Sequence, residues 1–525
     1  MSDPYQNTTK ASVRHQFLTS SVNSLTRDRR ESSILNTDEV HELIKYSFQQ
    51  LKKMGMAPPE QNLWDEFKQW SDFHGSRLST KKAEELRVIY LCGPEPQNDL
   101  NVLTSLGLNP HNIWAIESDP KTFNTAASKL ESFNPCVNLH RGSVGEFFQK
   151  VNEEFDIAYL DGTRPILSTR PRSLNPVIEI LSNGRLAPLS VLITNFSEPP
   201  EAETNKYAGV MTEYFRYRYN EVPTILHNSG LDPAIAAHDA SGYPEFIHSN
   251  IGEFYSEFIT RLVIDLGHTL IPMTKAMSSS ATLGLYTAPI AKRQKILEKA
   301  LGPTYIQSSS VNSVSDIFSQ LGHTQLSPSS YPFLSFLRTL KTSRIDPALY
   351  AQLTDWSKGG KKVLENFQFA SLLDRVTEGH WEVASLELLR ALKTSWFDSK
   401  NHFSCDLPLP NLLINSQLGI YGHPHYRSGR TSSRISYTAQ KNRMFLDLFV
   451  LDRCRSYFDW FPTVTQVPTR FKSIPFQIVA RCLMDRIRAR DSHSDNHPFR
   501  WSAVAPNNEL GYLAPIRPLQ SRVDL

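Results

Sequence analysis

A glycine and two carboxylates occupy comparable places along the chain, each at the end of a short run of strand-forming residues. Gly93 follows RVIYLC, Glu117 ends NIWAIE and Asp161 ends FDIAYLD. If these runs are neighbouring strands of a parallel sheet, the three residues meet at the carboxyl edge, where such sheets bind ligands. Taken singly, Gly93 fits a plain strand-to-helix turn and Glu117 a helix cap. Together they predict a ligand site.

The elements that must position these residues form a regular alternation between residues 86 and 195. Helical segments separate the apolar runs, and the clearest of them opens at Asp119 as the cap with Pro120 in the first turn. Strands that alternate with helices in this way predict an α/β fold with a mostly parallel sheet flanked by helices. The expected strands are RVIYLC, NIWAIE, VNLHR, FDIAYLD and LSVLIT.

The first 80 residues predict a different structure. Residues 1–36 are rich in Ser, Thr, Asn and Arg, which predicts a mobile leader, and residues 37–79 predict a helical extension whose first helix is capped by Asn36. A second helix there has a face of large apolar side chains, which favours packing over a ligand cage. These are Leu63, Trp64, Phe67 and Trp70.

After residue 200 the pattern predicts a helix over EFIHSNIGEFYSEFITRLVIDL. The runs HTLIPM and TLGLYTAP are expected to be late strands that close the sheet. We therefore expect a sheet domain over 80–290 and a mixed, helix-rich region over 291–525. Within that region RCLMDRIRARD predicts an amphipathic helix that points Arg481 and Arg488 to solvent and packs Val479, Leu483 and Ile487 inward.

The bulk properties exclude several protein classes. A net charge of +3 over 525 residues is too small for a protein whose overall charge drives nucleic-acid binding. The five cysteines lie far apart, without the pairs of a zinc site or the density of a disulfide scaffold. No signal peptide or uncharged membrane span of about 18 residues is visible. We expect a cytoplasmic protein without membrane contact.

The order of landmarks through residues 86–195 resembles the class I methyltransferases, Rossmann-like proteins that use S-adenosylmethionine. The resemblance implies that Gly93 lies beside the methionine part of the cofactor and Glu117 binds the ribose hydroxyls. Ser143 in HRGSVGEFF takes the position of the polar residue beside the adenine. Asp161 matches the acidic residue after the fourth strand, and FDIAYLDG is similar to a phrase of small-molecule O-methyltransferases.

Further roles follow from the resemblance and from the chemistry of methyl transfer. Such a transfer needs mainly positioning, with an optional base, and Asp161 is the candidate base. Tyr159 points to the same side of the strand as Asp161 and is expected to line the substrate pocket, together with Asn195. Catechol-type relatives bind magnesium with an Asp-Asn pair after strand five. The chain has Thr194-Asn195 there, so we expect no metal.

The chain also departs from the family pattern. Leu91 stands at the usual acidic position, and Gly93-Pro94-Glu95-Pro96 replaces a loop with three glycines, so two backbone donors are lost. Asp99 or Glu95 can substitute for the missing carboxylate, or either can cap the next helix. The NPPY signature of enzymes that methylate amino groups of nucleobases is absent after the fourth strand, which disfavours base methylation.

The C-terminal region offers two further candidates. His423 and His425 have the spacing of paired metal ligands, with Asp447 or Asp452 to complete a site, although histidines in a proline turn are usually structural. The segment 427–443 is basic, which allows contact with nucleic acid or a protein partner, but a solvated basic face or partner surface is the favoured interpretation. Its residues are Arg427, Arg430, Arg434, Lys441 and Arg443, interleaved with Tyr437 and preceded by Tyr426.

The sequence thus favours an S-adenosylmethionine-dependent methyltransferase acting on an unidentified acceptor. Two alternatives stay open: a non-catalytic binding protein built on the same scaffold, and a nicotinamide-linked oxidoreductase. The oxidoreductase ranks last because GPEPQN lacks the later glycines that admit a pyrophosphate.

Overall fold

In the residues that the computed structural model of the protein describes, nine strands form a mixed sheet with the order β3-β2-β1-β4-β5-β8-β7-β9, and β6 pairs with β8. Its first five strands have the order of a doubly wound α/β sheet. The structure describes residues 8–53, 55, 57–133, 136–169, 172–216, 242–278, 333, 336–337, 339–340, 345–354, 424–428, 432–439, 442–462, 466–470, 472–490 and 519–525.

The five strands expected between residues 86 and 195 are confirmed, and each pair among them is parallel. Their residues are largely apolar because helices cover both faces of the sheet. The strands are β1 (Val88–Leu91), β2 (Ile113–Glu117), β3 (Asn138–Arg141), β4 (Phe155–Asp161) and β5 (Leu186–Ser197).

The other half of the sheet comes from the C-terminal part of the chain. Strand β8 (Asn442–Asp452) pairs antiparallel with β5 along nine residue pairs, from Leu189–Asp452 to Ser197–Met444. Strand β7 (Ser433–Ala439) pairs antiparallel with β8, and β6 (Tyr426–Arg427) pairs with the end of β8. The last residues of the chain add β9 (Val523–Asp524) parallel to β7.

The prediction of late strands at HTLIPM was wrong, and TLGLYTAP lies outside the described residues. HTLIPM belongs to the long helix α13 (Ile251–Ser278). Leu262, Leu266 and Leu270 are all buried at helical spacing, and a short apolar run by itself does not distinguish a strand from a buried helix. The strands that close the sheet lie some 160 residues later, so the sheet continues past the boundary expected near residue 290.

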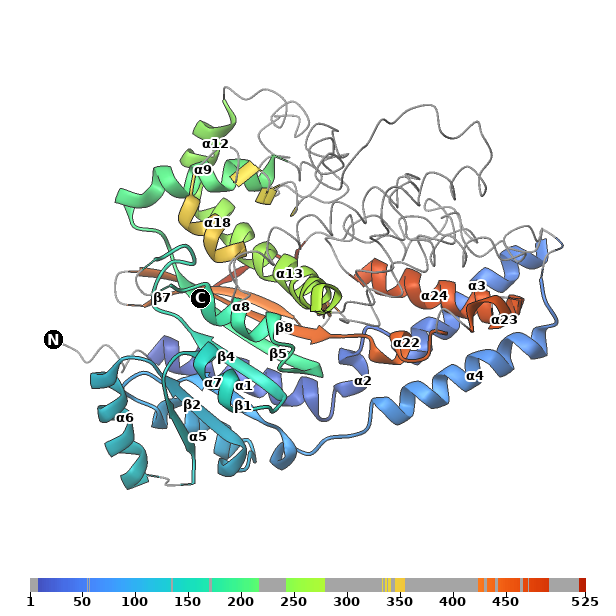
Figure 1. The fold of residues 1–525 in the computed structure, drawn as a ribbon, viewed down its shortest axis with the longest axis horizontal. Coiled ribbons are helices and arrows are strands. Elements are labelled where there is room, and N and C mark those ends of the chain that lie inside the picture. The colour runs from blue at the N-terminus through green and yellow to red at the C-terminus, as the bar shows by residue number, and fades with distance from the viewer. Residues whose placement is uncertain are drawn as a thin grey trace, which may run out of the picture.

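Helices cover both faces of the sheet (Figure 1). On one face lie α1 (Thr8–Leu25), α5 (Gln97–Ser105) and α6 (Pro120–Phe133). On the other lie α7 (Val144–Lys150), α8 (Asn175–Ser182), α9 (Thr204–Phe215), α12 (Tyr243–Ser249), α13 and α18 (Pro347–Thr354). Asp119 caps α6 as expected, since its Oδ2 accepts from the Thr122 amide at 2.8 Å.

The N-terminal residues differ from the expected mobile leader. Helix α1 buries Val13, Phe17, Leu18 and Val22 against the sheet, in one cluster with side chains of β1, β4, β5 and β7. The segment is polar overall, but its few apolar residues recur on one side of the helix, and that side alone packs. The first helix therefore belongs to the sheet layer.

A helical module is built from both ends of the chain. Helices α3 (Thr37–Lys53) and α4 (Glu60–Arg77) share one apolar cluster with α22 (Arg455–Phe458) and α24 (Ile474–Arg490), and α23 (Val467–Arg470) precedes α24. These helices lie together at the end of the molecule away from α5 and α6 (Figure 1). Asn36 caps α3 as expected, accepting from the Asp38 amide at 3.0 Å. The expected helix at RCLMDRIRARD is present, but Arg481 is fully buried instead of solvent-facing.

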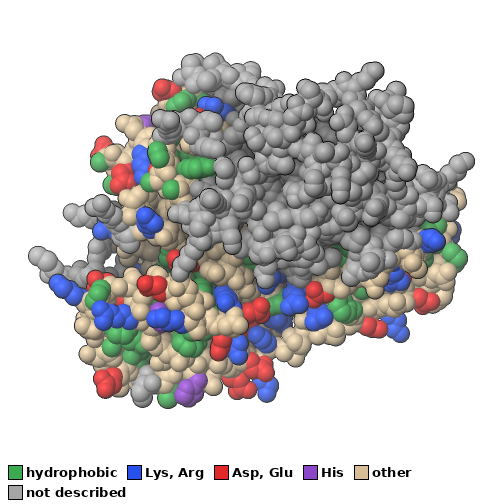
Figure 2. All heavy atoms as spheres, viewed as in Figure 1, with side chains coloured by type: hydrophobic (Ala, Val, Ile, Leu, Met, Phe, Trp, Pro, Cys, Tyr) green, Lys and Arg blue, Asp and Glu red, His purple; other side chains and the backbone are tan. Residues whose placement is uncertain are grey.

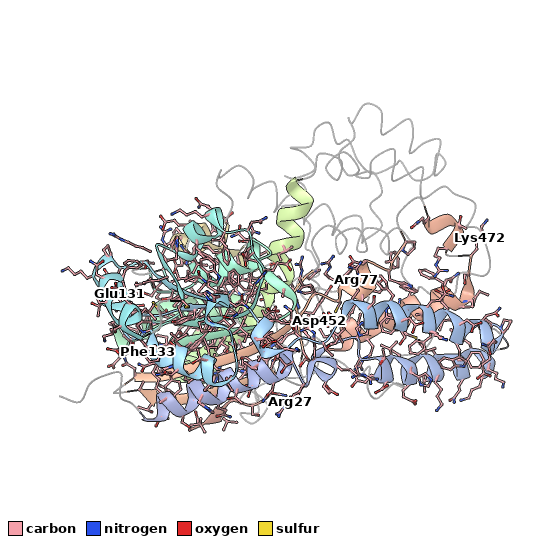
Figure 3. All side chains as sticks on the ribbon, turned by 90° about the horizontal axis from the view of Figure 1, so that it is seen from below. Arg27, Arg77, Glu131, Phe133, Asp452 and Lys472 are labelled. Atoms are coloured by element: carbon pink, nitrogen blue, oxygen red, sulfur yellow. The ribbon has the colours of Figure 1, made fainter. Side chains whose placement is uncertain are left out.

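Asp452 joins the helical module to the sheet. This buried carboxylate, at the end of β8, accepts hydrogen bonds from Ser33 Oγ at 3.0 Å, the Ile34 amide at 2.9 Å and the Cys454 amide at 2.8 Å. In Figure 3 it lies between the two regions, with Lys472 at the far end of the module. Burial raises the pKa of Asp452, while the three donors act in the opposite direction.

Two surface properties bear on partners. Lys and Arg side chains alternate with Asp and Glu over the described part of the face in Figure 2, so that face has no extended field of one sign. None of the helices that the structure describes combines the length and the hydropathy needed to cross a membrane.

Candidate functional site

The strand order brings the three predicted residues to one edge of the sheet. The order reverses between β1 and β4, and in sheets of this kind ligands bind outside the carboxyl ends of the strands at such a point. Gly93 follows β1, Asp161 ends β4, and Glu117 ends β2 on the other side of β1. The residues named for a ligand site from the sequence thus flank the position where the topology predicts one.

The loop after β1 is built around Gly93 and two prolines. Gly93 has a φ of +57°, a conformation that favours glycine, and a Cβ placed on it would meet no atom within 4 Å. The Pro96 carbonyl accepts from the Tyr90 hydroxyl at 3.2 Å and from the Leu100 amide at 3.2 Å. These two hydrogen bonds to Pro96 fix the loop, while the space beside the Gly93 backbone is open.

Glu117 has one carboxylate oxygen available. Oε1 accepts from the Asp119 amide at 2.7 Å, which fixes the turn into α6, and Oε2 has no hydrogen-bond partner among the described residues. The side chain is half-buried beside Cys92. Burial raises the pKa of the Cys92 thiol to about 12, and the nearby Glu117 and Asp99 add to the shift. A neutral thiol and a free carboxylate oxygen suit a hydroxyl-bearing ligand.

Ser143 has a structural role in this structure. Its Oγ accepts from the Glu146 amide at 3.1 Å, and Glu146 Oε2 accepts from the Ser143 amide at 2.8 Å. This reciprocal pair is a capping box at the start of α7. The hydroxyl can still donate to a ligand, but the cap alone explains a serine at this position.

Asp161 and Asn195 are adjacent, as the parallel register of β4 and β5 pairs them directly. The Asn195 amide nitrogen donates to Asp161 Oδ1 at 2.7 Å and to the Tyr437 hydroxyl of β7 at 2.9 Å. Lys10 of α1 contacts the other oxygen of Asp161, with Nζ at 2.8 Å from Oδ2. Asn195 Oδ1 is buried and has no partner among the described residues. An acceptor is thus available for a ligand donor or a water.

A second cation of α1 lies one turn further along the helix. Arg14 Nε is 2.6 Å from Oδ1 of Asp99, which lies in the first turn of α5, and both side chains are buried. Burial raises the pKa of Asp99 to about 6; Asp161 adds to the rise, while Arg14 and Lys10 oppose it. Tyr159 is also buried, and burial together with Asp161 and Asp99 raises the pKa of its phenol well above the usual value. Tyr159 therefore keeps its phenol proton and does not serve as a phenolate.

Gly162 lets Asp161 approach β5. A Cβ at Gly162 would lie 2.7 Å from the backbone oxygen of Asn195, closer than side-chain atoms approach a carbonyl. The loop that follows is held by two hydroxyls, with Tyr255 accepting from the Ile166 amide at 2.9 Å and Tyr207 from the Leu167 amide at 3.1 Å. The close contact with the Asn195 carbonyl thus explains why the residue after Asp161 in FDIAYLDG is a glycine.

Sequence reasoning missed four residues of this network: Lys10, Arg14 and Tyr437, and Asp99 in its role as a partner of Arg14. Lys10 and Arg14 are spaced by four, which places them on one side of α1, and this was the available signal. Nothing in the sequence brings Tyr437 to residue 195, because their strands are 242 residues apart in the chain.

The predicted C-terminal candidates are placed differently from the expectation. Asp447 accepts from Thr260 Oγ1 at 2.6 Å and pairs with Arg522 at 2.7 Å. His425 is buried, and His423 lies outside the described residues. Within the described ranges no group of three or more His, Cys, Asp or Glu side chains could hold a metal ion.

The basic segment is mostly buried where it is described. Arg427 and Arg434 are 4% and 3% exposed, and Arg434 Nη1 donates to Glu257 at 2.8 Å. The rings of Tyr426 and Tyr437 are buried as well. These four side chains are not a surface that phosphates or bases reach. Arg443 is 37% exposed, and Arg430 and Lys441 lie outside the described residues.

A concave surface also exists in the helical module, away from the strand ends. It measures about 680 Å³ and is lined by the start of α4 and the start of α24, including Pro58, Glu66 and Lys472. It holds none of the residues predicted for chemistry. We therefore place the candidate site at the carboxyl edge of the sheet, where the polar network and the topology coincide.

Comparison of the chain with known protein-family models finds no match, and neither does comparison with curated proteins.

Proposed function

We propose that the protein is an S-adenosylmethionine-dependent methyltransferase whose cofactor lies at the carboxyl edge of β1, β2 and β4. One observation carries the proposal. The strand order puts Gly93 and Asp161 on either side of the point where the order reverses, with Glu117 on the next strand. This is the arrangement that the resemblance to class I methyltransferases implies for the three residues.

The residues present fit such a cofactor. The open space over Gly93 allows a ligand to lie against the backbone, and the free oxygen of Glu117 can accept from a ribose hydroxyl. The amino-acid end of the cofactor carries an ammonium and a carboxylate. Lys10 and Asp161, which are partly exposed, offer one charge of each sign at this edge of the sheet.

When bound, the cofactor would supply an electrophilic methyl group, and the protein would supply mainly positioning. Asp161 is the group that we propose orients the acceptor and takes its proton. Asn195 and Lys10 fix the two oxygens of Asp161, so the carboxylate has one orientation. Tyr159 is buried in the cluster between α1 and the sheet, so its ring does not line an open pocket.

The second candidate is a non-catalytic binding protein on the same scaffold. The observations that favour it are the two prolines of the loop, which remove donors near Gly93, and the two cations of α1, which already neutralise Asp99 and Asp161. A nicotinamide-linked oxidoreductase is less consistent with the sheet. In the dinucleotide-binding order a sixth strand follows β5, whereas here the antiparallel strand β8 does.

Titration calorimetry with S-adenosylmethionine and, separately, S-adenosylhomocysteine tests the proposal on the full-length protein. We expect binding in the micromolar range and at least tenfold weaker binding by Glu117→Ala, because a lost hydrogen bond to a charged group costs about 1.5–3 kcal/mol. Glu131→Ala is the matched control, since it removes the same charge near the far end of α6, where Figure 3 shows Glu131.

The outcomes separate the two candidates. Binding that Glu117→Ala weakens and Glu131→Ala leaves unchanged supports the cofactor site. Equal affinity in both variants would refute the role of Glu117. No heat and no thermal stabilisation at millimolar ligand would favour the non-catalytic scaffold.

A further inference from the structure

The last seven residues of the chain are docked on the edge of the sheet. In β9, Val523 and Asp524 pair in parallel with Ile435 and Ser436 of β7, and the Leu525 amide donates to the Ser436 carbonyl at 2.9 Å. The side chain of Leu519 is buried in the cluster on the α13 face of the sheet. We refer to residues 519–525 as the C-terminal tail. It covers β7, which would otherwise be the edge strand.

Arg522 anchors the tail between α13 and the β7–β8 pair. Its guanidinium donates to Ser256 Oγ at 2.7 Å on the helix and to the carbonyls of Ile435 and Leu446 at 2.8 and 3.3 Å on the two strands. It also pairs with Asp447 at 2.7 Å, and its side chain is 6% exposed. One arginine of the tail thus ties together three elements that are far apart in the chain.

The strand held by the tail also supplies a residue of the candidate site. Side chains alternate along β7, so Ile435 and Tyr437 pack on the face of the sheet that α1 covers, while Ser436 points to the other face and contacts Asp524 of the tail. The Tyr437 hydroxyl accepts one hydrogen of the Asn195 amide, which donates to Asp161 as well. A path of direct contacts therefore runs from the tail through β7 to Asp161.

We propose that Arg522 is a positioning residue for the candidate site, and that docking of the C-terminal tail holds Tyr437, and through it Asn195 and Asp161, in the arrangement that binds ligand. The part that concerns ligand rests on the proposed function. Releasing the tail leaves β7 as an edge strand that is paired only with β8, so the Tyr437 hydroxyl is held less firmly beside Asn195. Coupling through packed contacts of this kind changes affinities by roughly 2- to 30-fold.

The test compares full-length Arg522→Ala, Arg522→Lys and Val523→Ala. Val523 is 55% exposed and pairs through its backbone, so Val523→Ala is a matched control in the tail. Two measurements need no ligand. Amide hydrogen exchange of residues 433–439 measures the stability of β7. The NMR signal of the Tyr437 ring, in protein with isotope-labelled tyrosine and assigned by its loss in Tyr437→Phe, measures the environment of that side chain. Affinity for S-adenosylmethionine is measured in parallel, at a temperature where circular dichroism shows every variant folded.

We expect faster exchange in β7, a shifted Tyr437 signal and about fivefold weaker binding in Arg522→Ala, with Val523→Ala like the wild type. Arg522→Lys keeps the charge opposite Asp447 but cannot reach both strand carbonyls. It should therefore shift the Tyr437 signal in the same direction as Arg522→Ala, and it replaces that variant in the test if Arg522→Ala does not fold. An unchanged Tyr437 signal in a folded Arg522 variant overturns the inference. If the wild type binds no cofactor, the proposed function fails, while exchange and the Tyr437 signal still decide the positioning role.

Discussion

The two ends of the sheet bury different kinds of side chain. At the carboxyl edge of β1 and β4, two cations of α1 meet Asp99 and Asp161, and a fully buried amide links Asp161 to Tyr437. At the opposite end, the helical module has an apolar and aromatic core with Trp70 and Phe476 fully buried. There a neutral histidine, His74, stacks on Trp70 with ring centroids 5.1 Å apart.

This difference separates a region whose core mainly stabilises the fold from the region where we propose the functional site. Apolar burial stabilises a fold without further partners, whereas buried charges cost free energy and are tolerated when each has a partner. The core of the helical module follows mainly the first rule. Three charged side chains, Arg481, Glu66 and Arg486, are buried beside that core, and Glu66 pairs with Arg470 while Arg486 pairs with Glu39. The carboxyl edge follows the second rule, since Asp99 pairs with Arg14 and Asp161 with Lys10.

The largest effect that we expect comes from the aromatic core of the helical module. Trp70→Ala removes a fully buried ring and should lower the free energy of unfolding by about 3–5 kcal/mol, measured by urea denaturation. Trp64, on the same face of α4 but only half-buried, is the matched control, and Trp64→Ala should cost much less. Equal losses would mean that the stripe does not pack as the structure shows.

The same variant also tests the independence of the two regions. If the comparison is right, Trp70→Ala leaves the affinity for S-adenosylmethionine unchanged at a temperature where the variant is folded. A loss of affinity in the folded variant would show that the helical module and the carboxyl edge are coupled.

Asp99 at the carboxyl edge and His74 in the helical module should make the free energy of unfolding depend on pH in opposite directions. The folded-state pKa of Asp99 is raised by burial to about 6, so the folded protein keeps a proton that the unfolded chain releases, and stability falls as pH rises from 3.8 to about 6. The pKa of His74 is lowered by burial to about 4, so the unfolded chain takes up a proton that the folded protein does not, and stability falls as pH drops from 6.5 to about 4.

Unfolding free energies between pH 4 and 7 for wild type, Asp99→Asn and His74→Gln measure both effects. Relative to Asp99→Asn, the wild type should lose on the order of 3 kcal/mol as pH rises through this window, and relative to His74→Gln it should lose a similar amount as pH falls. Parallel curves for all three proteins would show that neither group titrates differently in the folded state.

The smallest effect that we expect comes from Ser143, where the test separates a helix-capping role from a role in cofactor binding. Ser143→Ala removes the capping box of α7 and should cost about 1 kcal/mol of unfolding free energy. If capping is its only role, affinity for the cofactor stays unchanged, with Ser132→Ala on the exposed side of α6 as the control. A loss of affinity several times that of the control would restore Ser143 to the cofactor site.

Much of the fold was predictable because its signals are local. Each of the five parallel strands is an apolar run between turn residues, and Asp119 and Asn36 cap the helices predicted from them. The errors arose where local signals are ambiguous or weak. HTLIPM has the composition of a strand but belongs to α13, and the polar segment before residue 36 packs through a few apolar residues of α1.

The candidate site was predictable in part for the same reason. Gly93, Glu117 and Asp161 lie at the carboxyl ends of β1, β2 and β4, which are neighbours in the sheet, so the topology alone brings them to one edge. The residues that hold Asp161 came from elsewhere in the chain: Lys10 from the first helix and Tyr437, through Asn195, from β7. In the basic segment, the sequence did not show that Arg427 and Arg434 are buried in the sheet layer, and contact of the remaining basic residues with nucleic acid or a protein stays a prediction.

The sequence by itself determined the alternation of strands and helices, the caps and the acidic strand ends, because propensities and hydrophobic periods act over a few residues. Only the tertiary structure decided which strands close the sheet, which cations face Asp99 and Asp161, and that the last residues of the chain cover β7. These contacts join residues hundreds of positions apart. Their free energy depends on burial and pairing across the whole fold, which no local pattern encodes.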